Sequence, residues 1–81
     1  MIKHKLAVKS RGIKESLVEI VFFPKTDKEK QLIEGAKSAT LSEEDHIYFN
    51  ELLTSICLNH NYTPIAPMGY RGNSFLFKVV N

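Results

Sequence analysis

Two segments of this chain, residues 16–23 and 74–80, are apolar at most positions, and this feature most limits how the chain can fold. Both are rich in β-branched and aromatic residues, which is typical of β-strands. Side chains alternate between the two faces of a strand, so each segment places large apolar groups on both of its faces. The chain has only 81 residues, enough for one domain, residues 1–81, with few helices to cover a sheet. We therefore expect one apolar sheet face without a cover inside the chain.

The rest of the sequence predicts two more strands and two helices. Residues 2–9 alternate between an apolar row and a lysine-rich row, which indicates a half-buried strand. A capping box of Thr26 and Glu29 opens a short helix to Glu34, with Gly35 as its stop. Residues 62–67 form a strand that Pro64 and Pro67 confine to a sheet edge, and residues 69–73 form a turn.

A longer helix is predicted from a second capping box, Thr40-Leu41-Ser42-Glu43, to a left-handed stop at Asn61. Its apolar stripe, which we expect to face the core, contains Phe49, Leu52, Leu53, Ile56, Cys57 and His60. The element order is then β-β-α-α-β-β. We predict an α+β fold, a small four-stranded and mainly antiparallel sheet with one long and one short helix packed on one face.

Composition excludes several classes of protein. The formal net charge of +2 does not fit a histone-like nucleic-acid binder or an acidic solvating tail. The single cysteine, Cys57, excludes an internal disulfide framework and fits a reducing cytosol. Apolar runs long enough to span a membrane are absent, and the first five residues lack the apolar core of a signal peptide. We expect a cytoplasmic protein without membrane contacts.

The residues that could carry chemistry are few, and simpler roles explain them. Cys57 and His60 share a helix face and could supply two zinc ligands, but His4 and His46 would both have to join them. A small core residue and a histidine near a helix end account for the pair equally well. We expect no catalytic residue, no metal and no cofactor. Glu19 and Lys78, each isolated in an apolar strand, are predicted to form a cross-strand pair.

The uncovered sheet face is where a partner is expected. If Val18 and Phe75 face the helices with their alternating neighbours, the outer patch comprises Leu17, Val21, Phe23, Leu76 and Val80. Ile47 and Leu58 lie about 20° apart on the long helix, opposite its core stripe, and extend the candidate interface. We predict a non-catalytic binding or modulator protein, a homodimer or the ligand of another protein, of the kind common among bacterial and phage accessory proteins.

The alternative is an RNA or single-stranded DNA backbone binder. Its candidate contacts are the basic residues of the first strand and the residues of the last turn: Lys3, Lys5, Lys9, Arg11, Tyr70 and Arg71. Lysines on an edge strand also protect a sheet against aggregation without any ligand. Gly69-Tyr70-Arg71-Gly72 has the Gly-x-x-Gly form of KH domains, but a hairpin turn between two strands explains it.

Overall fold

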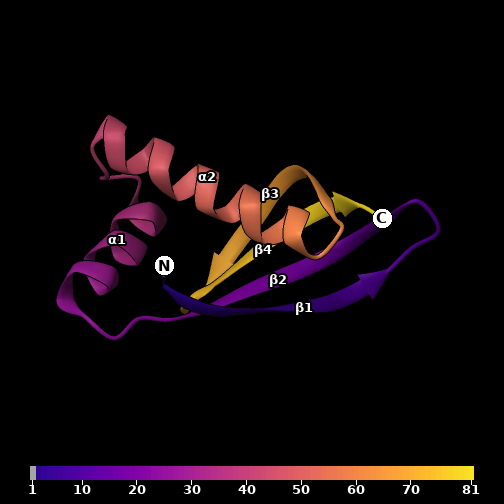
Figure 1. Cartoon of the computed structure of the whole chain (residues 1–81), viewed down its shortest axis with the longest axis horizontal. Helices are drawn as coiled ribbons and strands as arrows, with labels where there is room; N and C mark the ends of the chain where they lie inside the picture. The colour runs from indigo at the N-terminus through magenta and orange to yellow at the C-terminus, as the bar shows by residue number, and fades with distance from the viewer. Residues whose placement is uncertain (1) are drawn as a thin grey trace.

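The computed structural model describes residues 2–81, and Met1 lies outside them. Four strands and two helices follow in the predicted order (Figure 1). Their bounds are β1 Lys3–Arg11, β2 Glu15–Phe23, α1 Asp27–Ser38, α2 Glu43–Asn59, β3 Thr63–Arg71 and β4 Ser74–Val80. The strands form one antiparallel sheet in the order β1-β2-β4-β3, so the predicted α+β fold class is confirmed.

The order of the strands explains their composition. The two segments that are apolar on both faces, β2 and β4, are the central strands. The lysine-rich β1 and the proline-containing β3 are the edges, as expected for residues that weaken or block further pairing. β3 is longer than predicted and reaches Arg71, because it tolerates two irregularities in its register at Pro64/Ala66 and Pro67/Gly69.

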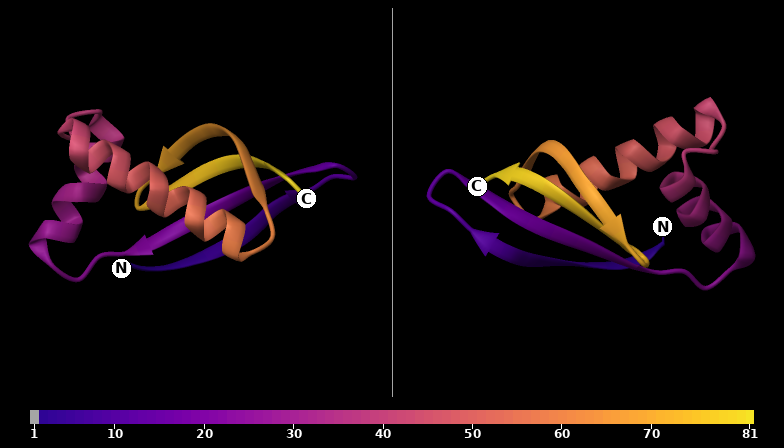
Figure 2. Two further views of the ribbon diagram at one scale, coloured as in Figure 1. Left: turned by 45° about the horizontal axis from the view of Figure 1, so that its top comes forward. Right: turned by 180° about the vertical axis from the view of Figure 1, so that it is seen from behind.

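The core lies between the sheet and α2. One face of the sheet contributes Val18, Ile20, Phe22, Phe75 and Val79, and α2 contributes Phe49, Leu52, Leu53, Ile56 and Cys57. Helix α2 lies diagonally over this face, and α1 lies at the end of the sheet below the start of α2 (Figures 1 and 2). α1 adds Ile33 to the core. We call this covered face of the sheet the inner face.

Both helices begin at a hydroxyl cap, but two predicted helix boundaries, the end of α1 and the start of α2, were wrong. The Thr26 side chain accepts a hydrogen bond from the Glu29 amide at 3.1 Å, as predicted. Gly35 is not the stop of α1; it is buried inside the helix against Leu41, and the left-handed residue that ends the helix is Ala39, with φ 56°. A side chain at position 35 would collide with Leu41, so this close contact, and not a need for a left-handed backbone, explains the glycine.

The start of α2 also differs from the predicted one. Its cap is Ser42, whose hydroxyl accepts from the Asp45 amide at 3.2 Å, and not Thr40, whose hydroxyl pairs with that of Ser38. At the other end of α2, the prediction that His60 belongs to the core stripe is wrong, because His60 is exposed and is the C-cap residue of the helix. The predicted left-handed stop at Asn61 is confirmed by its φ of 64°.

Candidate functional site

The outer face of the sheet, opposite α2, carries the predicted apolar patch. The register places one row of residues across the four strands as Lys5, Val21, Ser74 and Arg71, and the next row as Ala7, Glu19, Leu76 and Gly69. Leu17, Phe23 and Val80 follow the same alternation and lie on this face too. Phe23 is 42% exposed and Val80 41% exposed, whereas Leu17, Val21 and Leu76 are half-buried between their neighbours.

The helices leave this face uncovered. Seen from behind, the sheet lies in front of α2 (Figure 2, right), and α1 stays at the end of the strands. An antiparallel sheet with one covered face usually has a polar second face. Here the outward apolar residues of both central strands form an apolar band, which Glu19 and Lys78 interrupt. Large apolar groups gathered on an uncovered face are typical of a site of contact with another molecule.

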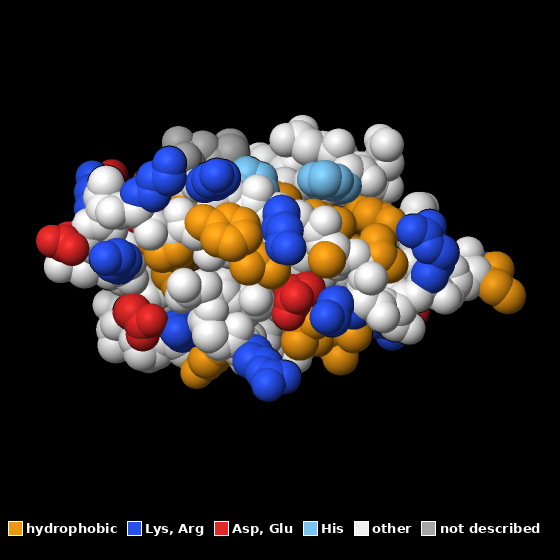
Figure 3. Space-filling view, turned by 90° about the horizontal axis from the view of Figure 1, so that it is seen from below, with side chains coloured by type: hydrophobic (Ala, Val, Ile, Leu, Met, Phe, Trp, Pro, Cys, Tyr) orange, Lys and Arg blue, Asp and Glu red, His pale blue; other side chains and the backbone are white. Residues whose placement is uncertain are grey.

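Basic side chains lie on both sides of the apolar band and, at Lys78, within it. Lys3, Lys5 and Lys9 come from β1, Arg71 from β3 and Lys78 from β4. Viewed from the side of β1, Lys and Arg side chains are spread over the surface with hydrophobic groups between them (Figure 3). Two acids share the face, and each has a lysine partner. Within residues 2–81 no salt bridge involves Lys3, Lys5 or Arg71, so the face keeps an excess of positive charge.

The predicted Glu19–Lys78 pair is wrong, although both side chains lie on the outer face. The Glu19 carboxylate is 3.8 Å from the Lys9 ammonium, and the Lys78 ammonium is 3.1 Å from the Glu15 carboxylate. The register puts Leu76 opposite Glu19 and Leu17 opposite Lys78, so the two predicted partners are only diagonal neighbours. Each residue pairs instead with a nearer charge, Glu19 with Lys9 of β1 and Lys78 with Glu15 at the start of β2. The Lys78–Glu15 pair is exposed, and exposed ion pairs contribute little stability.

The two helix residues of the predicted interface lie on a different surface. Ile47 is 50% exposed and Leu58 53% exposed, on the side of α2 that is turned away from the core. The helix and the sheet separate this side from the outer sheet face. The seven predicted interface residues therefore form two surfaces on opposite sides of the molecule, and one compact partner cannot cover both.

The predicted nucleic-acid contacts are also divided. Arg71 shares the outer face with the β1 lysines, but Tyr70 is in register with Phe75 of the inner face. Its ring lies 6.3 Å from that of Phe75 and 6.0 Å from the Lys37 ammonium of α1. Arg11, exposed at the end of β1, is in register with the buried Ser16. The Tyr70-Arg71 pair therefore does not act as one loop contact, because its two side chains belong to different faces.

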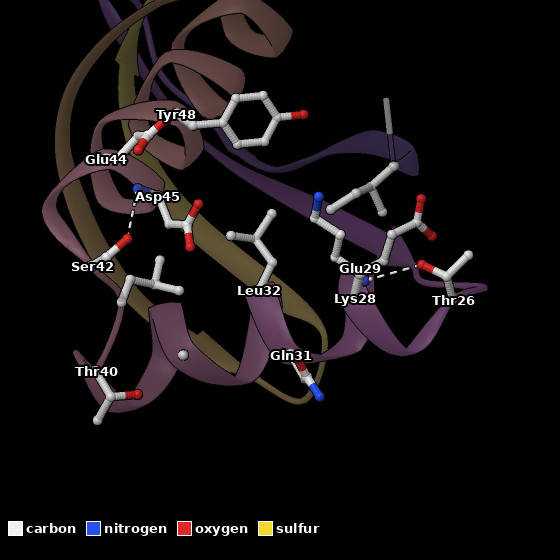
Figure 4. A pocket seen from close by; sticks show the side chains of 13 residues that line it. Thr26, Lys28, Glu29, Gln31, Leu32, Thr40, Ser42, Glu44, Asp45 and Tyr48 are labelled. Carbon is white, nitrogen blue, oxygen red and sulfur yellow. Dashed lines mark hydrogen bonds between the residues drawn. The ribbon is translucent and has the colours of Figure 1, made fainter.

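A cavity of about 750 Å³ opens between the starts of α1 and α2 (Figure 4). Leu32, Leu41 and Tyr48 supply apolar lining, and Glu44 and Asp45 lie on its rim. Two of the polar side chains that line it, Thr26 and Ser42, are the caps of the two helices (Figure 4). Among residues 2–81 no buried side-chain polar atom lacks a hydrogen-bond partner.

The groups considered for chemistry are dispersed. Burial raises the pKa of the Cys57 thiol above its ordinary value, which keeps it protonated and unreactive at neutral pH. His60 caps α2, His46 hydrogen-bonds Asn50 at 3.1 Å, and His4 bonds the Ile2 carbonyl at 2.9 Å. In the described part of the chain no three His, Cys, Asp or Glu side chains are grouped as metal ligands. None of the described helices is long and apolar enough to cross a membrane.

Sequence reasoning missed two features of these surfaces. If β3 is extended up to the turn at Gly72, Tyr70 and Arg71 are neighbours in a strand, and neighbouring side chains point to opposite faces. This alternation would have placed the two side chains on different faces of the sheet. Glu44 lies in line with Ile47, Glu51 and Leu58 on α2, and the helical repeat of 100° per residue would have been enough to predict this alignment.

Comparisons of the chain with protein-family models, with curated proteins and with solved structures gave no match, so its function is argued from this geometry.

Proposed function

We propose that this chain is a non-catalytic binding protein that docks a protein surface on the outer face of its sheet. Its first partner is a second copy of itself, so that a homodimer forms, and it acts by occluding or modulating the macromolecule that it binds. The observation that carries the proposal is the apolar band of β2 and β4, framed by basic residues, on a face that neither helix covers.

The size of the face limits the area that a contact can bury. Four strands spaced about 4.8 Å apart, over seven residues of about 3.3 Å each, give a face of about 450 Å². Contact of this face with a partner surface of equal area would bury on the order of 900 Å², which is at the low end of specific protein interfaces. We therefore expect weak, reversible association with a dissociation constant in the micromolar range. The lone buried thiol of Cys57 fits a reducing compartment, and we place the protein in the cytoplasm.

Sedimentation tests the proposal. The wild-type protein is compared with a double variant, Val21→Thr with Leu76→Thr, which makes the centre of the outer face polar while it keeps good strand formers outside the core. Ile13→Thr is the matched control, because Ile13 is 98% exposed at the tip of the β1–β2 hairpin, away from this face. Each protein is followed from about 5 to about 500 μM.

The wild type and the Ile13→Thr control should associate as the concentration rises, and the double variant should stay monomeric. A wild type that is monomeric over the whole range contradicts self-association. A double variant that associates as strongly as the wild type contradicts the assignment to the outer face. Circular dichroism of the double variant verifies that it is folded before either comparison is made.

Binding to a nucleic-acid backbone is the second candidate, and one observation favours it. Lys5 and Arg71 end the same row of the outer face, three strand spacings or about 14 Å apart, and neither forms a salt bridge within residues 2–81. One observation argues against nucleic-acid binding. Single-stranded nucleic acids are usually held by several bases that stack on aromatic side chains, whereas the register places one aromatic residue, Phe23, on this face.

Salt dependence separates the two candidates. If Lys5 contacts a phosphate, binding to a single-stranded homopolymer should weaken steeply as the salt concentration rises. Lys5→Gln should then flatten the slope of log K against log salt concentration by about one unit. If neither single-stranded RNA nor DNA is retarded in a gel at low salt, the second candidate is excluded.

A further inference from the structure

The solvent side of α2 is the second surface that lacks a partner. Glu44, Ile47, Glu51 and Leu58 follow one line along the helix, at spacings of three, four and seven residues that return to nearly the same side. Ile47 and Leu58 are half exposed, and Tyr48 beside them is 48% exposed. We call this line of four residues the α2 stripe. It is apolar and acidic, on the opposite side of the molecule from the outer sheet face.

The two surfaces are opposite in charge. Between Lys37 and Arg71 the chain contains no lysine or arginine, and α2 carries four acids. The outer sheet face carries five basic residues and two acids, and lysines already pair with both acids. Complementary potentials of this kind select partners and orient them, whereas like charges placed opposite one another disfavour a contact.

The two surfaces also match in size. A helix of 17 residues, like α2, is about 25 Å long, and a strand of nine residues, like β2, is about 30 Å long. A helix about 10 Å wide fits over the apolar central strands, between edge strands that lie about 14 Å apart. Ile47 and Leu58 would then meet the apolar band, and Glu44 and Glu51, which lie on the same line of α2, would meet the basic residues that share this face.

Symmetric contacts lack this complementarity. Two outer sheet faces brought together would oppose two basic frames, with Lys3, Lys5 and Arg71 unpaired within each copy over residues 2–81. Two antiparallel α2 stripes centred on Glu51 would place this acid against its own copy. Only contact between unlike surfaces unites apolar groups and opposite charges at once.

We infer that copies of this chain associate head to tail, with the α2 stripe of one copy on the outer sheet face of the next. This inference rests on the proposed function and names the surface that docks there. The contact gives the sheet a helix layer on its second face, the arrangement by which folded domains commonly bury a two-sided apolar sheet. Because each copy keeps one free surface of each kind, the homodimer is the first step towards a ring or an open chain.

A mixing experiment with two variants tests the inference. The sheet variant is Val21→Thr with Leu76→Thr, and the helix variant is Ile47→Ala with Leu58→Ala, which removes exposed apolar groups but keeps strong helix formers. Each variant retains one intact surface. Ile13→Ala serves as the control for loss of an exposed isoleucine.

Head-to-tail contact predicts that each variant alone sediments as a monomer of 9.2 kDa where the wild type associates, with an affinity lowered about tenfold or more. Mixed in equal amounts, they should form a heterodimer, because the intact α2 stripe of the sheet variant can dock on the intact sheet of the helix variant. The heterodimer should not grow further, since both of its remaining surfaces are defective.

The other outcomes distinguish the two proposals. A helix variant that associates alone as strongly as the wild type overturns the head-to-tail arrangement and leaves docking on the sheet face intact. Variants that remain monomeric when mixed also overturn it. A wild type that never associates overturns this inference together with the self-association in the proposed function.

Discussion

The two faces of β2 can be compared with one chemical change made at two valines. Val18 is 0% exposed and lies in the core, whereas Val21 lies three residues further on the outer face, half-buried between Lys5 and Ser74. Both are paired on both sides in a central strand, so replacing either by alanine changes strand propensity similarly. The difference in cost then reports the difference between a closed core and an uncovered face.

Val18→Ala removes two methyl groups from the core, which costs about 1.6 kcal/mol in transfer free energy at about 0.8 kcal/mol per group. The closed cavity adds about 1 kcal/mol, at about 24 cal/mol for each of some 40 Å³. We expect a loss of about 2.5 kcal/mol in the free energy of unfolding. Val21→Ala leaves no closed cavity and loses only part of the transfer term, so we expect about 1 kcal/mol or less.

Urea unfolding at about 1 μM protein, where weakly associating copies are separate, measures both values. Equal slopes with urea would show that each variant unfolds from the same kind of folded state. Losses that agree within about 0.5 kcal/mol, or a larger loss for Val21→Ala, would refute the argument that the outer face is uncovered in the monomer.

Three further predictions concern local structure. Ala39→Gly should raise the free energy of unfolding by about 1 kcal/mol in a urea titration, because Ala39 ends α1 with a left-handed φ of 56°; an unchanged or lower stability would contradict this geometry. Ser42→Ala should cost about 1 kcal/mol and Thr40→Ala much less, and the reverse order would show that Thr40 is the cap of α2. Burial raises the pKa of the Cys57 thiol above its ordinary value, so the unfolded chain loses this proton first. Stability should therefore fall as the pH rises past the ordinary thiol pKa of about 8.5, and Cys57→Ala should lose this part of the slope. Rapid reaction of the native thiol with a disulfide reagent at pH 7 would contradict its burial.

The strand pattern was predictable because period-two alternation and composition act locally. β2 and β4 were recognised from their β-branched and aromatic residues, and their apolar character on both faces indicated their central position. The prolines likewise placed β3 at an edge. The division of Val18 and Val21 between the faces also follows from alternation, once one face is assigned to the helices.

Features that depend on tertiary packing could not be predicted in this way. Gly35 resembles a helix stop in sequence, but it is selected by the approach of Leu41, which only the folded chain shows. Glu19 and Lys78 share a face as expected, yet their ion pairs depend on the strand register and on the reach of Lys9. The two candidate surfaces were joined into one interface because sequence indicates which residues are exposed, and not on which side of the molecule they lie.

The most direct test of the central claim follows side-chain methyl resonances in nuclear magnetic resonance spectra as the concentration rises from about 20 to about 500 μM. Docking on the outer sheet face predicts that methyl signals of Leu17, Val21 and Leu76 shift progressively, while those of Val18 in the core and Ile13 at the hairpin tip stay constant. Spectra that do not change over this range, or shifts that leave the outer-face methyl groups unaffected, would contradict docking on the outer sheet face.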